Sequence, residues 1–414
     1  MTLTEIGIGA KTAAAQLAVT GAGEKNAALE GIAQALDAGR QEIKAANERD
    51  LAAAETAGMA KHMLDRLTLT EGRVDDMIAG VRSVAALEDP IGEVISMSNR
   101  PNGLTIGRRR VPLGVIAIIY ESRPNVTVDA AVLCLKAGNA VILRGGKEAI
   151  HSNMTLMAIM RRALKAAGLP ENALNLVEDT RRESATELMG LSDYVDVLIP
   201  RGGAGLIRSV VENARVPVIE TGVGNCHIYV DGDADLEMGA QIIYNAKCSR
   251  PSVCNAAENL IVDRSIAEAF LPKAKALLDQ ANTELRGDAA TCRILGNAVK
   301  PAVDEDYATE FSDYILAVRV VDGLDEAIAH IQKYTTGHSE CIVTESYTKA
   351  QRFLNEVDAA AVYVNASTRF TDGSEFGLGA EIGISTQKMH ARGPMGLKEL
   401  TSSKYIVYGS GQIR

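Results

Sequence analysis

Tryptophan is absent from the 414 residues, and aromatic residues make up only 4% of them. Basic residues are not in excess: the formal net charge is −10, which argues against a nucleic-acid partner because such a partner requires cations to replace its counterions. The longest apolar runs, such as residues 115–120, are too short to cross a bilayer, so no membrane partner is expected. Residues 1–5 lack the basic and apolar regions of a secretory signal. The remaining composition, 47% hydrophobic and 23% charged, is typical of a globular protein of two or three domains.

The six cysteines include no C-x-x-C pair. Scattered cysteines favour reduced thiols in the cytoplasm over a disulfide framework or a zinc site. Cys226-His227 could offer two metal ligands, but nothing nearby completes the set that zinc needs, so no metal is expected. The six positions are Cys134, Cys226, Cys248, Cys254, Cys292 and Cys341.

Residues 5–88 are rich in alanine, with larger apolar residues at three- and four-residue spacing, which predicts helices. Asn102-Gly103 lies between two extended runs and predicts a β-hairpin. A lone hairpin is marginally stable, so this one needs a partner. The alternating stretch 399–409 could be that partner, and so could another subunit.

From Val111 onward, short apolar runs alternate with helical patterns, which predicts a parallel sheet in a doubly wound α/β domain. A second set of strands and helices follows Cys254. The crevice of such a sheet lies at the carboxyl ends of its strands. In the first set, strands are expected at 113–120, 140–144, 173–177, 194–199 and 216–219; in the second, at 258–263, 315–321, 339–343 and 360–365.

Two glycine-containing turns fall between an expected strand and an expected helix. Arg144-Gly-Gly-Lys147 lacks the spacing of a P-loop, yet two glycines, a lysine and a helix N-terminus suit an anion better than they suit a plain turn. Arg201, Gly202 and Gly203 could present backbone N–H groups and a guanidinium to a second phosphate, although the G-x-G-x-x-G spacing is missing.

Three further residues could carry chemistry. Cys254 begins a segment after a non-helical Ser-Arg-Pro-Ser turn, with Arg250 and Lys247 nearby, where a thiolate could be favoured; a buried structural cysteine is the alternative. Glu220 ends an apolar strand and is equally a capping group or a general acid/base. Asn125 could stabilise an oxyanion or cap the helix that follows it.

Five stretches together resemble the γ-glutamyl phosphate reductase family, which belongs to the aldehyde dehydrogenase superfamily. The resemblance covers nearly the whole chain, and Arg250-Pro-Ser-Val-Cys254 and His390-Ala-Arg-Gly-Pro-Met-Gly-Leu397 are its most specific parts. The stretches are 120–129, 220–227, 249–257, 375–387 and 389–397.

The resemblance implies an aldehyde dehydrogenase-like fold with two doubly wound α/β domains. It also implies an oligomerisation element, made of the hairpin and the C-terminal strand, and hence a homo-oligomer. The implied parts are an NADPH-binding domain (1–92 and 110–225), a catalytic domain (226–396) and the oligomerisation element (93–109 and 397–414).

Carried over by motif, Cys254 is the nucleophile, and Asn125 stabilises the oxyanion together with the Cys254 backbone N–H. Glu220 matches the general base of the superfamily. Its duty here stays open, because an acyl-phosphate reductase must keep water away from its thioester. The resemblance also implies that Arg250, Arg369 and Arg392 hold a phosphate or an α-carboxylate, although a structural ion pair is an equal alternative for each.

Arg144-Gly-Gly-Lys147 occupies the segment in which relatives use Lys-Pro-x-Glu, whose glutamate holds the adenosine ribose hydroxyls of NAD. Lys147 stands at that position, and a cation suits a ribose 2′-phosphate. NADPH is therefore the expected cofactor. Glu310 resembles the glutamate that contacts the nicotinamide ribose.

The implied function is NADPH-dependent reduction of L-glutamate 5-phosphate to L-glutamate 5-semialdehyde and phosphate through a thioester on Cys254. This is the second step of proline biosynthesis, with glutamate kinase expected on a separate chain. Two alternatives are a hydrolytic NAD(P)-dependent aldehyde dehydrogenase and a catalytically silent dinucleotide-binding protein.

Overall fold

The computed structural model describes residues 1–121 and 123–414, without the side chains of Lys61 and His62. Ser122, within the 120–129 motif, lies outside the described residues. Contacts divide the chain into two compact units: the first comprises Met1–Thr221, Gly377–Gly383 and Met395–Arg414, and the second comprises Gly222–Phe376 and Ile384–Pro394. No described helix is long and apolar enough to cross a membrane.

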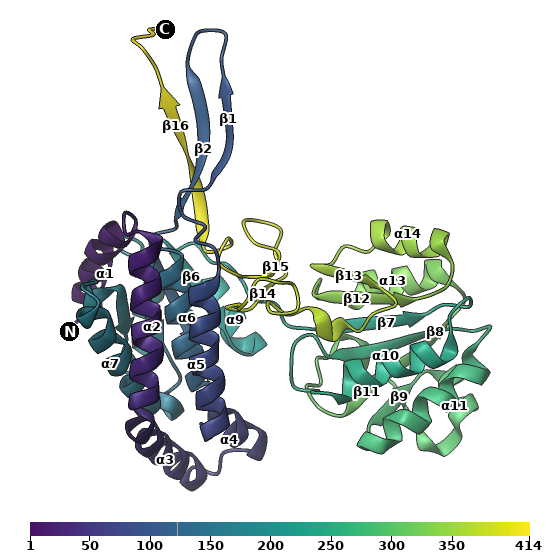
Figure 1. Ribbon diagram of the computed structural model, residues 1–414. Helices are drawn as coiled ribbons and strands as arrows, with labels where there is room; N and C mark the ends of the chain where they lie inside the picture. Colours follow the sequence, from purple (N-terminus) through teal and green to yellow (C-terminus); the bar gives the residue numbers. More distant parts are fainter. Residues whose placement is uncertain (122) are drawn as a thin grey trace. The chain divides into compact units, whose positions relative to one another are not determined.

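The first unit begins with helices, as the spacing of apolar residues predicts. Thr2 starts the first of them with a reciprocal capping box to Glu5, and the Thr70 side chain caps the fifth. Helices α2 and α5 lie side by side (Figure 1). The five helices are α1 (Leu3–Leu17), α2 (Ala22–Ala38), α3 (Arg40–Thr56), α4 (Lys61–Leu67) and α5 (Glu71–Ala86).

A four-stranded parallel sheet follows, in the order β5-β4-β3-β6. Every residue of β3 is buried, as expected for a strand covered on both faces. The chain moves outward from β3 to β5 and then returns to the other side of β3, so the switch point lies between β3 and β6. The strands are β3 (Val115–Tyr120), β4 (Ala140–Arg144), β5 (Leu174–Leu176) and β6 (Val197–Arg201); the helices are α6 (Pro124–Lys136), α7 (Ile150–Ala166), α8 (Arg182–Met189) and α9 (Ala204–Asn213).

The strand expected at 216–219 is reduced to an isolated parallel bridge between Leu198 and Val218. Leu198 N–H donates to the Pro217 carbonyl at 2.8 Å, and Ile219 N–H donates to the Leu198 carbonyl at 3.0 Å. Pro217 has no N–H to extend the ladder, which explains why a regular strand does not form here.

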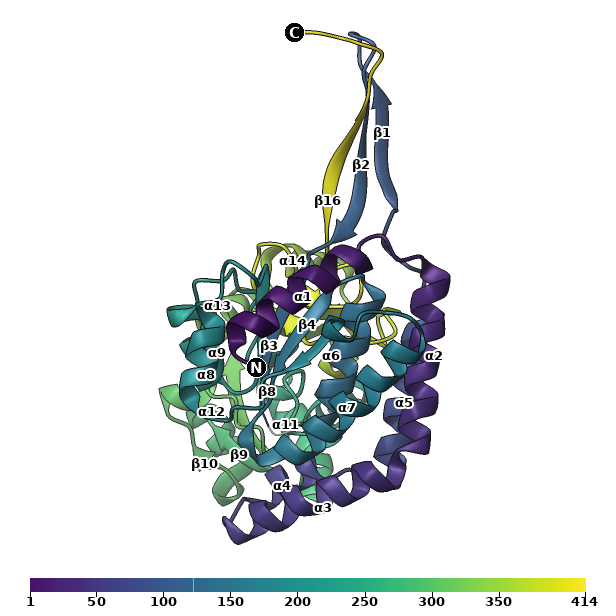
Figure 2. The ribbon, with the colours of Figure 1, turned by 90° about the vertical axis from the view of Figure 1, so that its left-hand side faces the viewer.

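The expected hairpin pairs with the C-terminal stretch. Strands β1 (Val94–Asn99), β2 (Thr105–Pro112) and β16 (Thr401–Tyr408) form an antiparallel sheet in the order β1-β2-β16. Every residue of β1 is exposed. Figure 2 shows this ribbon extending beyond the helices of its own unit. The partner expected for the hairpin within the chain is confirmed, while the role of the ribbon in oligomerisation stays a prediction.

The second unit is built on a seven-stranded parallel sheet in the order β10-β9-β11-β8-β7-β12-β13. Alternate residues of its central strands pack into apolar clusters on opposite faces of the sheet. Ile228 and Leu260 belong to one cluster, and Tyr229 and Ile261 belong to the other. This alternation confirms the doubly wound α/β class. The strands are β7 (Cys226–Val230), β8 (Ala257–Asp263), β9 (Glu284–Gly287), β10 (Lys300–Pro301), β11 (Ile315–Val321), β12 (Ser339–Val343) and β13 (Ala361–Val364); the helices are α10 (Leu236–Cys248), α11 (Ala267–Leu278), α12 (Ala289–Leu295), α13 (Leu324–Tyr334) and α14 (Tyr347–Glu356).

Candidate active site

Cys254 lies in the turn that joins α10 to β8. The Asp235 side chain caps the start of α10, and the helix ends at Cys248, just before the Ser-Arg-Pro-Ser stretch that was expected to end it. Cys254 is half-buried, whereas Cys134, Cys226 and Cys341 are buried. Cys254 is therefore not a fully buried cysteine, and its role as a nucleophile stays a prediction.

The segment that contains Gly224 and Cys226 packs tightly against the backbone of Cys254. The Cys226 thiol donates a hydrogen bond to the Cys254 carbonyl oxygen at 3.3 Å. A Cβ atom on Gly224 would lie 2.7 Å from the Cys254 Cα atom and closer still to its carbonyl group. Only a glycine at position 224 allows this approach without a shift of the turn.

Arg369 holds the same turn from the side. Its Nε atom donates to Ser249 Oγ at 3.1 Å, and its Nη1 atom donates to Asn255 Oδ1. The Asn255 side-chain amide donates in return to the carbonyl oxygens of Arg369 at 3.2 Å and Thr371 at 3.0 Å. These bonds fix both ends of the turn that carries Cys254.

Arg369 also interacts electrostatically with Cys254. Burial lowers the pKa of Arg369 and the nearby Arg250 lowers it further, while Asp372 and an ionised Cys254 thiol act in the opposite direction. Two of the three arginines assigned to the substrate thus lie at the Cys254 turn, with Arg250 exposed.

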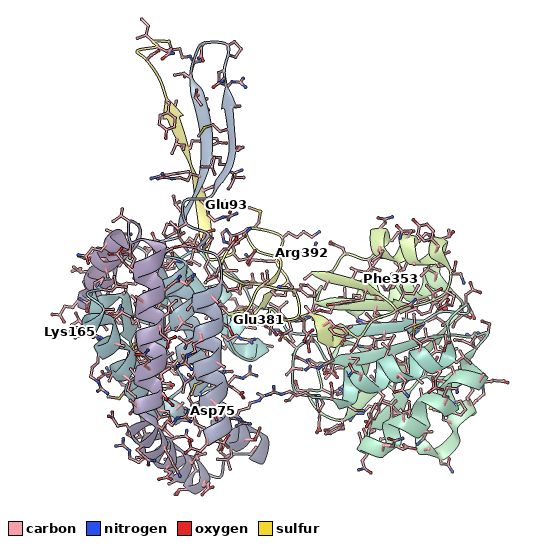
Figure 3. The ribbon with its side chains drawn as sticks, viewed as in Figure 1. Asp75, Glu93, Lys165, Phe353, Glu381 and Arg392 are labelled. Carbon is pink, nitrogen blue, oxygen red and sulfur yellow. The ribbon has the colours of Figure 1, made fainter. Side chains whose placement is uncertain are left out.

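Arg392 is differently engaged. Its Nη2 atom forms an ion pair with Asp358 Oδ1 at 2.7 Å, and Lys388 Nζ lies 2.5 Å from the other oxygen of the same carboxylate. Figure 3 shows Arg392 on the segment between β14 (Ile384–Ser385) and β15 (Gly393–Pro394). The ion pair left open as its alternative role is therefore formed.

A fully buried ion pair spans the Cys254 turn. Lys247, in the last turn of α10, lies 2.6 Å from Glu258 on β8, and neither side chain is exposed to solvent. Burial raises the pKa of Glu258 to about 7, against the opposing effect of Lys247. The second Glu258 oxygen accepts the Ser312 N–H at 3.2 Å. Glu310 is half-buried and its charge also acts on Glu258, so the segment assigned to the nicotinamide ribose lies near the Cys254 turn.

Lys247 was noted in the sequence only as a nearby cation, and Glu258 was not singled out at all. The one signal for Glu258 was a carboxylate at the start of an apolar strand. Such a residue is buried only with a partner, and the sequence does not identify that partner.

In the first unit, Asn125 is the second residue of α6, after Arg123 at the N-cap and Pro124. Its Nδ2 atom donates to Asp129 Oδ2 at 3.0 Å, so the alternative in which Asn125 caps the helix is wrong. Burial raises the pKa of Asp129 to about 6, while the Asn125 hydrogen bond and the charge of Arg201 act against that rise. Sequence reasoning missed Asp129, although it lies four residues after Asn125 on one helix face.

The turn after β6 carries a carboxylate where a phosphate was expected. Gly203 N–H, at the start of α9, donates to Glu121 Oε2 at 2.9 Å. Arg201 lies close to Asp129 and to the backbone of Gly383. A phosphate at Gly203 would have to displace the Glu121 side chain.

The turn after β4 retains the features of an anion site. A Cβ atom on Gly145 would lie 3.1 Å from Tyr120 Oη and closer to Asn153 Nδ2, and that buried amide nitrogen has no hydrogen-bond partner among the described residues. Lys147 is exposed. Arg144, by contrast, donates to the carbonyl oxygens of Thr180 and Arg181 at 2.9 and 3.1 Å and so braces the loop after β5.

Glu220 is half-buried and lies one residue before the end of the first segment of the first unit. Thr221 Oγ1 donates to the Pro200 carbonyl at 2.7 Å, which ties this segment to the end of β6. The first unit thus brings Asn125, Arg201 and Glu220 to the carboxyl ends of its strands, next to the switch point between β3 and β6. The Arg144-Gly-Gly-Lys147 turn, which follows β4 at this edge of the sheet, fits a phosphorylated ligand such as a dinucleotide.

Comparison with known proteins places the chain in a class. The model of the aldehyde dehydrogenase family matches residues 7–314 and 308–406. The fold is shared with an acetylating aldehyde dehydrogenase from Geobacillus thermoglucosidasius, at a TM-score of 0.71 and 19% identity over 100% of this chain and 97% of that one. The chain belongs to the aldehyde dehydrogenase family, which uses a nicotinamide dinucleotide.

Within that family, its relatives are γ-glutamyl phosphate reductases. The enzyme of Carboxydothermus hydrogenoformans is 62% identical over 98% of this chain and 97% of its own length, and that of Heliobacterium modesticaldum is 61% identical over the same shares. The crystal structure of γ-glutamyl phosphate reductase from Thermotoga maritima matches at a TM-score of 0.97 and 50% identity, covering 100% of this chain and 99% of that one. The family and the fold expected from the sequence are confirmed.

Proposed function

We propose that this protein reduces L-glutamate 5-phosphate to L-glutamate 5-semialdehyde and inorganic phosphate, with NADPH as the reductant, in the second step of proline biosynthesis. The observation that carries the proposal is the half-buried Cys254, held by Arg369 in a chain whose relatives are γ-glutamyl phosphate reductases. Glutamate kinase, on a separate chain, would supply the acyl phosphate.

In this mechanism the Cys254 thiolate attacks the carbonyl carbon of the acyl phosphate. The carbonyl oxygen takes up the negative charge, and the Asn125 amide and the Cys254 backbone N–H are assigned to stabilise it. The C–O bond to phosphate then breaks, leaving a γ-glutamyl thioester on Cys254. NADPH, when bound, supplies the hydride that reduces this acyl group to the aldehyde.

The remaining residues bind and orient the substrate. Arg250 and Arg369 are assigned to the phosphate or the α-carboxylate, since a planar guanidinium can hold either with two hydrogen bonds. The same role for Arg392 requires it to exchange or share its ion pair with Asp358. Glu220 is not assigned to water activation, because water would hydrolyse the thioester.

The cofactor would lie against the Arg144-Gly-Gly-Lys147 turn, with Lys147 paired to the ribose 2′-phosphate. Support comes from the exposed Lys147 and from the unpartnered, buried amide nitrogen of Asn153 beside Gly145. Arg201, Gly202 and Gly203 are assigned to a second phosphate, which would replace the Glu121 carboxylate at Gly203. Glu310 is assigned to the nicotinamide ribose.

We further propose a cytoplasmic homo-oligomer, with the β1-β2-β16 ribbon as its contact. The six cysteines are scattered and include no C-x-x-C pair, which suits a reducing compartment. The ribbon exposes the side chains of Val94, Ile95, Tyr405 and Val407. Exposed apolar side chains gathered on one element are typical of a protein–protein contact.

The reverse reaction tests the activity. NADP reduction by glutamate 5-semialdehyde should continue only when inorganic phosphate is present, because phosphate must release the acyl group from Cys254. Continuous reduction in phosphate-free buffer would instead identify a hydrolytic aldehyde dehydrogenase. No NADP reduction in either buffer would refute the proposed activity.

A further inference from the structure

The Asn125 side chain is held by a carboxylate on its own helix. Asn125 and Asp129 are four residues apart on α6, and Asn125 Nδ2 donates to Asp129 Oδ2 at 3.0 Å. An asparagine amide has two N–H donors on that nitrogen. Asp129 engages one of them, and the other is a donor that Asp129 does not use.

Asp129 occupies a costly position for a charged group. It is only partly exposed, and its burial raises the pKa of its carboxyl group to about 6. The charged group that faces it from another element is Arg201, at the end of β6; on its own helix, Asn125 is its hydrogen-bond partner. The carboxyl group is therefore mainly ionised at neutral pH and becomes protonated in mildly acidic solution.

The ionisation state decides which way the amide can face. An ionised carboxylate only accepts hydrogen bonds, so it selects the orientation in which Nδ2 of Asn125 points toward it. A protonated carboxyl group can donate to Asn125 Oδ1, which permits the amide to turn over. The turned amide would present a carbonyl oxygen where an oxyanion needs a donor.

We propose that Asp129 is a positioning residue for the oxyanion site, and that its carboxylate fixes the Asn125 amide with one N–H directed at the substrate oxygen. This inference rests on the proposed function, in which Asn125 stabilises the oxyanion. Asp129 itself does not contact the substrate; it acts through Asn125.

The test is a double-mutant cycle measured as pH profiles. Asp129→Asn, Asn125→Ala and the double variant are compared with the wild type in the phosphate-dependent reverse reaction from pH 5 to 9. Asp193→Asn, an exposed aspartate of the same unit, controls for the loss of one charge. Asp129→Ala gives a second variant in case the new amide disturbs folding, and thermal unfolding reports the fold of each protein.

Asn125→Ala should lower kcat by about 100-fold to 1000-fold, as expected for loss of an oxyanion donor. Asp129→Asn should lower kcat at pH 8 by roughly tenfold with little change in KM, because the new amide can donate as well as accept and no longer selects the orientation in which Nδ2 of Asn125 faces residue 129. It should also remove the acid limb that we expect near pH 6 in the wild-type profile. In the Asn125→Ala background, the same Asp129 substitution should change kcat less than about twofold.

An unchanged kcat and acid limb in Asp129→Asn would overturn the role of Asp129 alone. The same conclusion would follow if the loss of kcat in the double variant equalled the product of the two single losses, because the two residues would then act independently. Full activity in Asn125→Ala would overturn both the oxyanion role and this inference. A wild type with no phosphate-dependent turnover would refute the proposed function itself, so the failures can be told apart.

Discussion

Gly224 packs directly beneath Cys254: a Cβ atom added to Gly224 would come within 2.7 Å of the Cys254 Cα atom. Both residues belong to one segment of the second unit, with β7 and α10 between them, and Cys226, two residues after Gly224, donates its thiol hydrogen to the Cys254 carbonyl. The position of Cys254 is thus set by backbone packing as well as by side chains.

Gly224→Ala should displace the Cys254 turn. We expect kcat to fall by at least about tenfold and the free energy of unfolding to fall by about 1–3 kcal/mol, because the added methyl group overpacks the site. Gly31→Ala is the matched control: Gly31 lies in α2 with open space around it, so alanine should raise stability by up to about 1 kcal/mol. Unchanged kinetics in Gly224→Ala would show that the turn does not depend on this contact.

Arg369→Leu should slow alkylation of Cys254 by iodoacetamide at pH 7 by about threefold to tenfold, because a nearby cation favours the thiolate. Peptide mapping would measure the rate at Cys254 separately from the other cysteines. Arg369→Lys keeps the charge but loses the planar guanidinium that holds Ser249 and Asn255. We therefore expect its alkylation rate to fall less than its kcat, each relative to the wild type. Arg352→Leu, on α14, is the control for removing an arginine from this unit. Equal alkylation rates in Arg369→Leu and the wild type would exclude the electrostatic role.

The Lys247–Glu258 pair should behave as a buried ion pair. Lys247→Met alone leaves a buried carboxylate without its partner and should cost about 3–5 kcal/mol of unfolding free energy, whereas Lys247→Met with Glu258→Leu should recover most of it. Urea denaturation measures both. The partly exposed pair Lys275–Asp279 is the comparison, and Lys275→Met should cost less than about 1 kcal/mol. Equal losses in the single and double variants would mean that the two charges do not compensate each other.

Lys147→Glu should raise the KM for NADPH at least about tenfold more than the KM for NADH, because a carboxylate would repel a 2′-phosphate and could accept from a ribose hydroxyl. Initial rates with both cofactors give the ratio directly. Lys44→Glu makes the same charge change at an exposed position on α3 and should leave the ratio unchanged. An unaltered preference in Lys147→Glu would remove this side chain from the cofactor site.

Local patterns were enough to predict much of the fold. The end of α10 was predictable because Pro251 cannot continue a helix, and the pairing of β16 with the hairpin followed from its alternating pattern. The segment 216–219 shows the limit of that reasoning, since its apolar residues read as a strand but Pro217 cannot complete the ladder. Strand β7 was not expected, because five residues that include Cys226 and His227 give little sign of complete burial.

The candidate site was less predictable, because it depends on contacts between distant segments. Cys254 and Asn125 were singled out through their motifs. The residues that surround them could not be predicted from the sequence. The burial of Lys247 depends on Glu258 across a turn, and the occupation of Gly203 N–H depends on Glu121 from another strand end. Neither partner has a sequence signature that separates it from an ordinary surface carboxylate.

The central claim is that Cys254 carries the substrate's acyl group during turnover. Protein mixed with glutamate 5-semialdehyde and NADP in phosphate-free buffer, then quenched with acid, should gain one γ-glutamyl group, and peptide mass mapping should place it on Cys254. Cys254→Ser, with its fold intact by thermal unfolding, should gain none and show no phosphate-dependent turnover. Full turnover by Cys254→Ser, or an acyl group mapped to another residue, would contradict the account.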